Sequence, residues 1–104
     1  MTMKRSVSKI IKDGLKGLDY QRIVLFGSRA RGQASATSDY DLLIILKKDL
    51  TVQQKMKIAG KLRKKFAQKG LDADIIVKSE SEIRPSKARI GSVVRRALAE
   101  GVSL

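Results

Sequence analysis

An apolar strand that opens with two acidic residues constrains the fold of this chain more than any other stretch. Asp39 and Asp41 are separated by one residue and lead directly into the aliphatic run 42–46. Side chains two residues apart in a strand lie on the same face, so the two carboxylates are predicted to stand side by side. Two like charges repel each other at such a strand entry. A divalent cation makes the arrangement favourable, and Mg²⁺ suits carboxylate and phosphate oxygens best.

A shorter apolar strand, predicted over residues 23–26, runs straight into Gly27 and Ser28. Glycine lets a backbone approach a ligand closely. Ser28 stands where we expect the N-terminus of a short helix, whose free N–H groups form a natural phosphate cradle. Arg29 and Arg31 add positive charge nearby. A Gly-Ser pair taken alone is more often a tight turn without a ligand, so a phosphate site needs the support of other residues.

A third strand, predicted over residues 71–77, carries another acidic residue at its apolar run. Asp74 directly precedes that run, as Asp41 does in the strand before. If the two strands are neighbours, Asp74 can join Asp39 and Asp41 around one site. Asp72 is the alternative, since it lies on the same face two residues earlier. We prefer Asp74 and assign Asp72 to the loop that enters the strand.

Composition limits the chemistry and the partners of the chain. Its 104 residues suit one domain, expected over 1–104, and include no cysteine and no histidine. Thiolate chemistry, Cys/His zinc sites and histidine bases are therefore excluded. The excess of 23 Lys and Arg over 10 Asp and Glu gives a charge of +13, which favours polyanionic partners without choosing among them. The longest aliphatic run is far shorter than the ~20 residues of a membrane span, so we expect a cytoplasmic protein.

Three segments have the spacing of amphipathic helices, namely 2–16, 51–69 and 86–100. A polar link is predicted over 78–86. The middle helix is the most basic, and it is predicted to begin at Asp49 or Thr51 and to end at Gly70. Its predicted core face consists of apolar residues at helical spacing: Val52, Met56, Ala59, Leu62 and Phe66.

The first two strands and their connection carry a resemblance to a known family. Residues 27–32 read GSRARG and are followed, after five residues, by SDYDL at 38–42. This arrangement resembles the G-S-x-A-R-G-x5-S-D-x-D-L signature of the minimal nucleotidyltransferases, which belong to the DNA polymerase beta-like superfamily. Every fixed position of the signature is present at the expected spacing. The resemblance implies an α/β (α+β) fold in which a small mixed sheet is flanked by helices.

The resemblance also implies an activity and its site. A nucleoside monophosphate, AMP from ATP in our prediction, would be transferred to an acceptor, with two Mg²⁺ ions held by Asp39, Asp41 and Asp74. Asp74 would also act as the general base towards the attacking hydroxyl. The triphosphate would be bound by the residues of the signature around the turn: Gly27, Ser28, Arg31 and Ser38.

The acceptor is expected on another molecule, because the chain has little left to build an acceptor domain. Small members of the resembled family pair with helical HEPN proteins in toxin–antitoxin systems, which implies a HEPN-type partner here. Two alternatives stay open. One is an antitoxin that binds its partner without chemistry. The other is a nucleic-acid-binding module that uses the basic surface of the chain, including the helix 51–69. Self-association of the chain is a separate question that also stays open.

Overall fold

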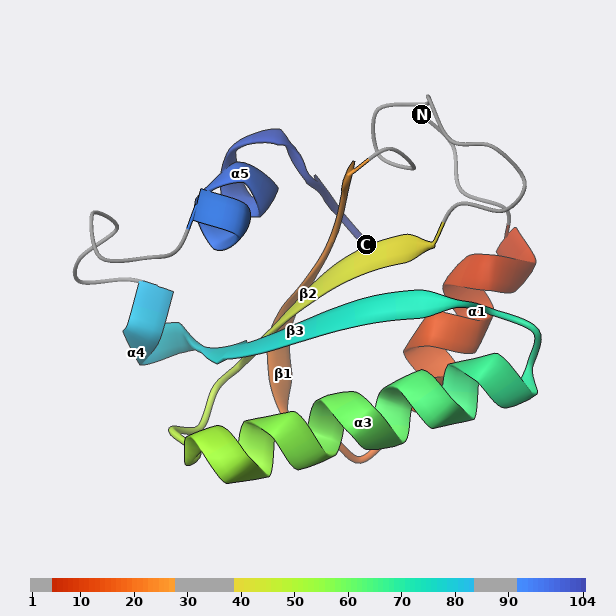
Figure 1. Ribbon diagram of the computed structural model, residues 1–104, viewed down its shortest axis with the longest axis horizontal. Helices are drawn as coiled ribbons and strands as arrows, with labels where there is room; N and C mark the ends of the chain where they lie inside the picture. Colours follow the sequence, from red (N-terminus) through yellow and green to blue (C-terminus); the bar gives the residue numbers. More distant parts are fainter. Residues whose placement is uncertain (1–4, 28–38, 84–91) are drawn as a thin grey trace.

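A mixed β-sheet forms the centre of the structure, a computed structural model that describes residues 5–27, 39–83 and 92–104. The elements of the described residues, in chain order, are α1 (Arg5–Gly14), β1 (Tyr20–Phe26), β2 (Tyr40–Leu46), α3 (Val52–Gln68), β3 (Ala73–Ser79), α4 (Glu80–Ile83), α5 (Ser92–Glu100) and β4 (Val102–Ser103) (Figure 1). The strand order is β3-β2-β1-β4. β2 and β3 are parallel, whereas β1 is antiparallel to both β2 and β4. The predicted mixed sheet flanked by helices is therefore confirmed.

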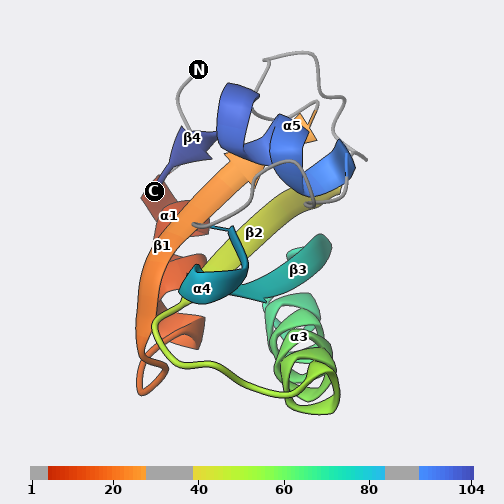
Figure 2. The same cartoon turned by 90° about the vertical axis from the view of Figure 1, so that its left-hand side faces the viewer.

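The sheet separates two apolar layers, because successive side chains of a strand point to opposite faces. On one face, Leu42, Ile44 and Leu46 of β2 pack with α1 and α3. On the other face, Leu43 and Ile45 pack with α5. Figure 2 shows α3 on one side of the sheet and α5 on the other. Burial on both faces explains why β2 reads as an unbroken aliphatic run.

Helix α3 begins and ends where the sequence predicts. The Thr51 side chain accepts a hydrogen bond from the Gln54 N–H at 3.1 Å, and the Gln54 side chain accepts one from the Thr51 N–H at 2.9 Å. This reciprocal pair is a capping box, which satisfies two N–H groups that the helix leaves unpaired. Gly70 takes a φ of +79°, which lets the chain turn away after the helix.

The predicted core face of α3 is right from Ala59 onwards and wrong at Val52 and Met56. Ala59 packs against the core, and Leu62 and Phe66 are buried, but Val52 and Met56 are 67% and 69% exposed. Lys55 is buried in their place. The reason lies in the tertiary structure, because Lys55 meets an acidic partner from a later segment of the chain.

That later segment differs from the predicted polar link over 78–86. β3 continues to Ser79 and the short helix α4 follows it, so the prediction is wrong for residues 78–83. The Ser79 N–H donates to Glu82 Oε1 at 2.8 Å, which closes the first turn of α4 onto the end of the strand. The remaining part of the predicted link lies outside the described residues.

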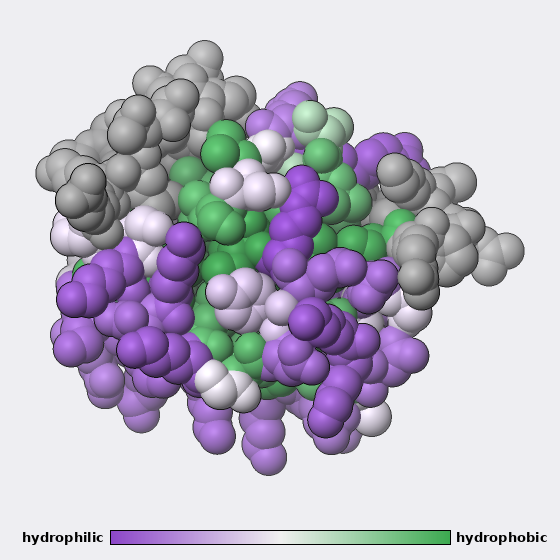
Figure 3. Space-filling view, turned by 180° about the vertical axis from the view of Figure 1, so that it is seen from behind, coloured by the Kyte–Doolittle hydropathy of each residue, from purple (hydrophilic) through white to green (hydrophobic). Residues whose placement is uncertain are grey.

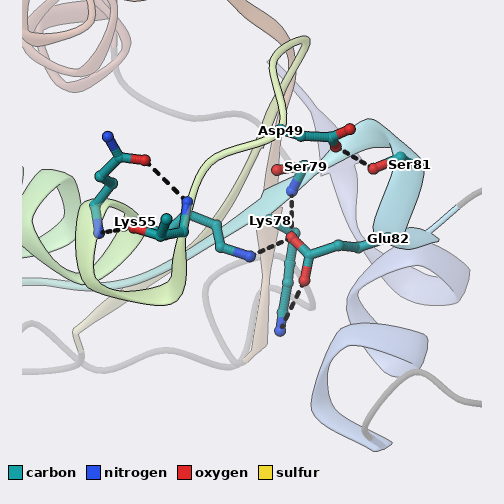
Figure 4. Close-up of polar contacts among 8 residues, drawn as sticks. Asp49, Lys55, Lys78, Ser79, Ser81 and Glu82 are labelled. Atoms are coloured by element: carbon teal, nitrogen blue, oxygen red, sulfur yellow. Dashed lines mark hydrogen bonds and ion pairs between the residues drawn. The ribbon is translucent and has the colours of Figure 1, made fainter.

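Glu82 joins α3 to the end of β3 (Figure 4). The Lys55 ammonium donates to Glu82 Oε1, and Lys78 Nζ lies 4.0 Å from Glu82 Oε2. Partial burial raises the pKa of the Glu82 carboxyl, but hydrogen bonds to it and the two neighbouring ammonium groups outweigh this effect and hold the pKa below its ordinary value. The carboxylate thus compensates a lysine that would otherwise be buried without a counter-charge.

The C-terminal segment completes the sheet. Val102 of β4 pairs with Leu25 of β1, and the Leu104 N–H donates to the Ile23 carbonyl at 3.0 Å. Seen from behind, hydrophobic side chains gather in a central strip, and hydrophilic side chains cover much of the lower part of this face (Figure 3). In the described ranges, no helix combines the length and the apolar character that a membrane crossing requires.

We expect Glu82→Gln to destabilise the fold at neutral pH by about 1–3 kcal/mol, because Lys55 stays buried without a counter-charge. Since the folded pKa of Glu82 is lowered, its contribution is present above the ordinary value of 4.5 and is lost as the pH falls through the folded value. Urea unfolding between pH 7 and pH 3 should therefore show a smaller loss of stability in Glu82→Gln than in the wild type. Glu100→Gln, at an exposed position, should follow the wild type. If the free energy of unfolding depends on pH in the same way in all three proteins, the stabilising role assigned to Glu82 is contradicted.

Candidate active site

The parallel pairing of β2 and β3 brings two of the predicted carboxylates opposite each other. Asp41 is the register partner of Asp74. Asp41 lies two residues before Leu43, and Asp74 lies two residues before Ile76, both of which pack on the α5 face. The two carboxylates therefore share that face of the sheet, on strands about 4.8 Å apart.

Gly27 lies against one of these carboxylates. Phe26, the last residue of β1, is the register partner of Asp41, and Gly27 follows it with a φ of +77°. A Cβ atom at Gly27 would lie only 2.2 Å from Asp41 Oδ2. The position therefore requires glycine twice, once for the left-handed backbone and once for the space that Asp41 occupies.

Asp39 and Asp72 lie at the same end of the sheet. Asp39 directly precedes β2, and the Tyr40 N–H donates to the Asp72 carbonyl at 2.9 Å. Asp39 and Asp72 line a pocket of about 210 Å³ together with Asp74. Asp72 lies outside β3, in the loop that enters it, as predicted. The register thus places Asp74, and not Asp72, opposite Asp41.

Arg63 of α3 makes a contact near this site that sequence analysis did not anticipate. Its Nη2 lies 3.8 Å from Asp74 Oδ1, and both side chains are more than half exposed. An exposed pair of this kind contributes little to stability. The sequence carries no signal for Arg63, because only the packing of α3 beside β3 brings it near Asp74.

Three of the predicted nucleotide-binding residues, Ser28, Arg31 and Ser38, lie outside the described residues. In the part of the chain that the structure describes, no group of three or more His, Cys, Asp or Glu side chains has an arrangement suited to a metal ion. Like charges directly opposite each other on neighbouring strands are unfavourable. The Asp41–Asp74 pair is therefore a place where a cation would be stabilising.

A comparison with protein-family models decides the family. The model described as polymerase beta, nucleotidyltransferase, matches residues 9–95, which is most of the chain. The chain belongs to this family. The resemblance drawn from the signature at residues 27–42 is therefore confirmed, and the strands that carry Asp41 and Asp74 lie within the matched nucleotidyltransferase domain.

Similarity to individual proteins agrees with the family. The domain is 44% identical over 55 residues to a candidate protein adenylyltransferase of Methanocaldococcus jannaschii, a match that covers 53% of this chain and 50% of that relative. It therefore spans about half the length of the curated relative. Among solved structures, a candidate nucleotidyltransferase from Sulfolobus solfataricus has a TM-score of 0.62 and 24% identity, covering 94% of this chain and 76% of that one.

A complex from Shewanella oneidensis, in which a tri-AMPylated HEPN toxin is bound to its MNT antitoxin, is a second similar structure. It has a TM-score of 0.50 and 18% identity, covering 94% of this chain and 65% of that one. At these identities the two structural similarities establish the fold alone. They agree with the mixed sheet and its helices as described above.

We expect Gly27→Ala to destabilise the protein by more than the roughly 1–2 kcal/mol that a left-handed backbone costs an alanine. The added Cβ must also displace the Asp41 carboxylate. Gly70→Ala is the matched control, since its φ is +79° and no atom lies within 4 Å of the added Cβ. The difference between the two variants in urea unfolding should vanish when Asp41 is replaced by alanine. If Gly27→Ala and Gly70→Ala lower the free energy of unfolding equally in the protein that keeps Asp41, the carboxylate is not the obstacle.

Proposed function

We propose that the chain is a Mg²⁺-dependent nucleotidyltransferase that transfers AMP from ATP to a hydroxyl group of another molecule. The observation that carries this proposal is the register pairing of Asp41 with Asp74, beside the backbone of Gly27. Membership of the nucleotidyltransferase family supports the class of reaction. The Methanocaldococcus jannaschii relative, named for protein adenylylation, supports AMP as the transferred group and a protein as the acceptor.

The donor set at this end of the sheet fits Mg²⁺, since all the available ligands are carboxylate oxygens and Mg²⁺ prefers oxygen. Asp39, Asp41 and Asp74 would hold the ion or ions. When bound, Mg²⁺ neutralises the charge that develops on the phosphate oxygens. Gly27 leaves room for Asp41 and for the approach of phosphate, and the signature residues Ser28, Arg31 and Ser38 would complete the binding of the triphosphate.

The reaction requires no covalent bond between the protein and the nucleotide. The acceptor oxygen attacks the α-phosphorus of ATP in line, the bond from that phosphorus to the bridging oxygen of the β-phosphate breaks, and pyrophosphate leaves. The Asp74 carboxylate takes the proton of the acceptor hydroxyl. Positioning and neutralisation of charge then supply most of the rate enhancement.

A HEPN-type protein is the partner that we propose. The Shewanella oneidensis complex, which shares the fold, holds an AMPylated HEPN toxin against an MNT antitoxin. In this proposal the chain is the antitoxin, and AMP transfer neutralises the toxin. The acceptor then reaches the site as part of a second protein.

The transfer itself is tested with Mg²⁺, α-phosphate-labelled ATP and a lysate of the source cells. Wild-type protein should move the label onto a macromolecule, and the Asp39→Ala/Asp41→Ala double variant should not. Asp74→Asn should slow the transfer about 10²–10⁴-fold, as the loss of a general base does.

Asp72→Asn is the matched control for Asp74→Asn, because it removes a neighbouring carboxylate that lines the same pocket. It should retain most of the transfer. If Asp72→Asn slows the transfer more than Asp74→Asn does, Asp72 is the general base. Binding of ATP and of a HEPN-type protein without any transfer of label would identify the chain as an antitoxin that acts by binding alone.

A second prediction concerns the stability of the site. Asp39→Asn should leave the metal-free protein as stable as the wild type or more so, because it relieves repulsion between carboxylates. Mg²⁺ with ATP at 100 times the dissociation constant should stabilise the wild type by about 2.7 kcal/mol and the variant far less. Thermal unfolding with and without the ligands measures both. A large loss of stability in the metal-free variant would make Asp39 a structural residue.

A further inference from the structure

A groove runs along the outer edge of β3. One stretch of about 270 Å³ is lined by residues 75–78 of the strand, and the pocket of about 210 Å³ is lined by residues 72–74. Because successive side chains point to opposite faces, a groove lined by consecutive residues follows the edge of a strand. The two stretches together follow the strand from the Lys78 end to the carboxylates Asp39 and Asp74.

The opposite wall of the groove is a flank of α3 with an unusual composition for this helix. Its residues step by four, three, four and four, so they form one stripe: Val52, Met56, Ala59, Arg63 and Ala67. Val52 and Met56 are exposed, and Arg63 is the stripe's only charged residue. Lys55, which is buried against Glu82, also lines the groove. The other flank lines separate grooves and holds four other lysines of the helix: Lys57, Lys61, Lys64 and Lys65.

The edge of β3 itself is open in the described part of the chain. β3 is the outermost strand, paired with β2 alone, and Figure 2 shows it at the outer side of the sheet beside α3. An unpaired edge offers a row of N–H and C=O groups that another strand can pair with. Its seven residues give an edge of about 20 Å, which suits a short extended segment.

We propose that this groove receives an extended segment of the acceptor protein, which adds to the edge of β3 and carries the accepting hydroxyl to Asp74. The inference rests on the proposed function and names the form of its substrate. Main-chain hydrogen bonds to β3 hold the segment, and apolar side chains of the segment pack against Val52 and Met56. Nucleic acid is disfavoured there, because four carboxylates line the two stretches, Asp39, Asp72, Asp74 and Glu82, against three basic side chains, Lys55, Arg63 and Lys78.

The position of the groove provides the connection to the chemistry. A segment paired along residues 75–78 continues directly into the pocket that Asp39, Arg63 and Asp74 line. A serine, threonine or tyrosine at that end of the segment has its hydroxyl beside Asp74. The hydroxyl loses its proton to this carboxylate, its oxygen bonds to the α-phosphorus of ATP, and pyrophosphate leaves.

The test uses a pool of synthetic decapeptides that carry one central serine, threonine or tyrosine. With Mg²⁺ and α-phosphate-labelled ATP, the wild type should label this pool at least about tenfold more than the same pool with N-methylated backbone amides, which cannot pair with a strand edge. Val52→Glu/Met56→Glu should reduce labelling about tenfold while ATP binding stays unchanged.

The matched control is Gln53→Glu/Gln68→Glu, which adds the same charge at exposed positions of α3 away from the groove. It should label the pool as the wild type does. Thermal unfolding should give similar midpoints for both double variants, because all four replaced side chains are exposed. Equal labelling of the two pools, or unchanged labelling by Val52→Glu/Met56→Glu, would overturn the proposal.

The remaining outcomes separate this inference from the proposed function. Label on lysate proteins but not on peptides, or label on a 20-nucleotide RNA, would reject the groove and keep the transferase. Dimerisation in sedimentation that Val52→Glu/Met56→Glu abolishes would assign the edge to a second copy and also reject the acceptor segment. Absence of both ATP binding and label on every acceptor would reject the proposed function itself.

Discussion

The parallel pairing of β2 with β3 is the interaction on which the candidate site depends. It sets Asp41 opposite Asp74 and directs both side chains to the α5 face. A slip of one residue would send one carboxylate to the opposite face, among the apolar side chains that α1 and α3 cover. Burial of β2 on both faces makes such a slip costly. The hydrophobic core thus fixes the register of β2 and β3, and this register places Asp41 opposite Asp74.

Helix α3 serves this arrangement in two ways. Through Leu62 and Phe66 it covers one face of the sheet, and through Lys55 it meets Glu82 just after β3. Both contacts hold the helix beside the strand edge. The same placement puts Lys57, Lys61, Lys64 and Lys65 on the flank away from the groove. The basic side chains that line the groove lie near carboxylates, Lys55 and Lys78 at Glu82 and Arg63 at Asp74.

Much of the fold and the candidate site follows from local patterns. The acidic pair before the aliphatic run, the GSRARG stretch of the family signature and the capping residue Thr51 each depend on nearby residues, and these predictions needed no knowledge of distant contacts. The predicted core face of α3 failed at Val52 and Met56 for the opposite reason. Periodicity counts apolar residues, and it cannot recognise that Lys55 is buried because Glu82, 27 residues later, supplies its counter-charge.

The sequence by itself determined the family and the mixed sheet, and it predicted the three carboxylates of the candidate site, because the signature and the apolar strands are local features of the chain. Only the tertiary structure decided which carboxylates face each other, that Asp41 occupies the space beside Gly27, and that Arg63 lies near Asp74. Among the described residues, it also decided that the edge of β3 is left unpaired along a flank of α3. These relations depend on strand order, register and helix packing, which join segments far apart in the chain and leave no spacing in the sequence.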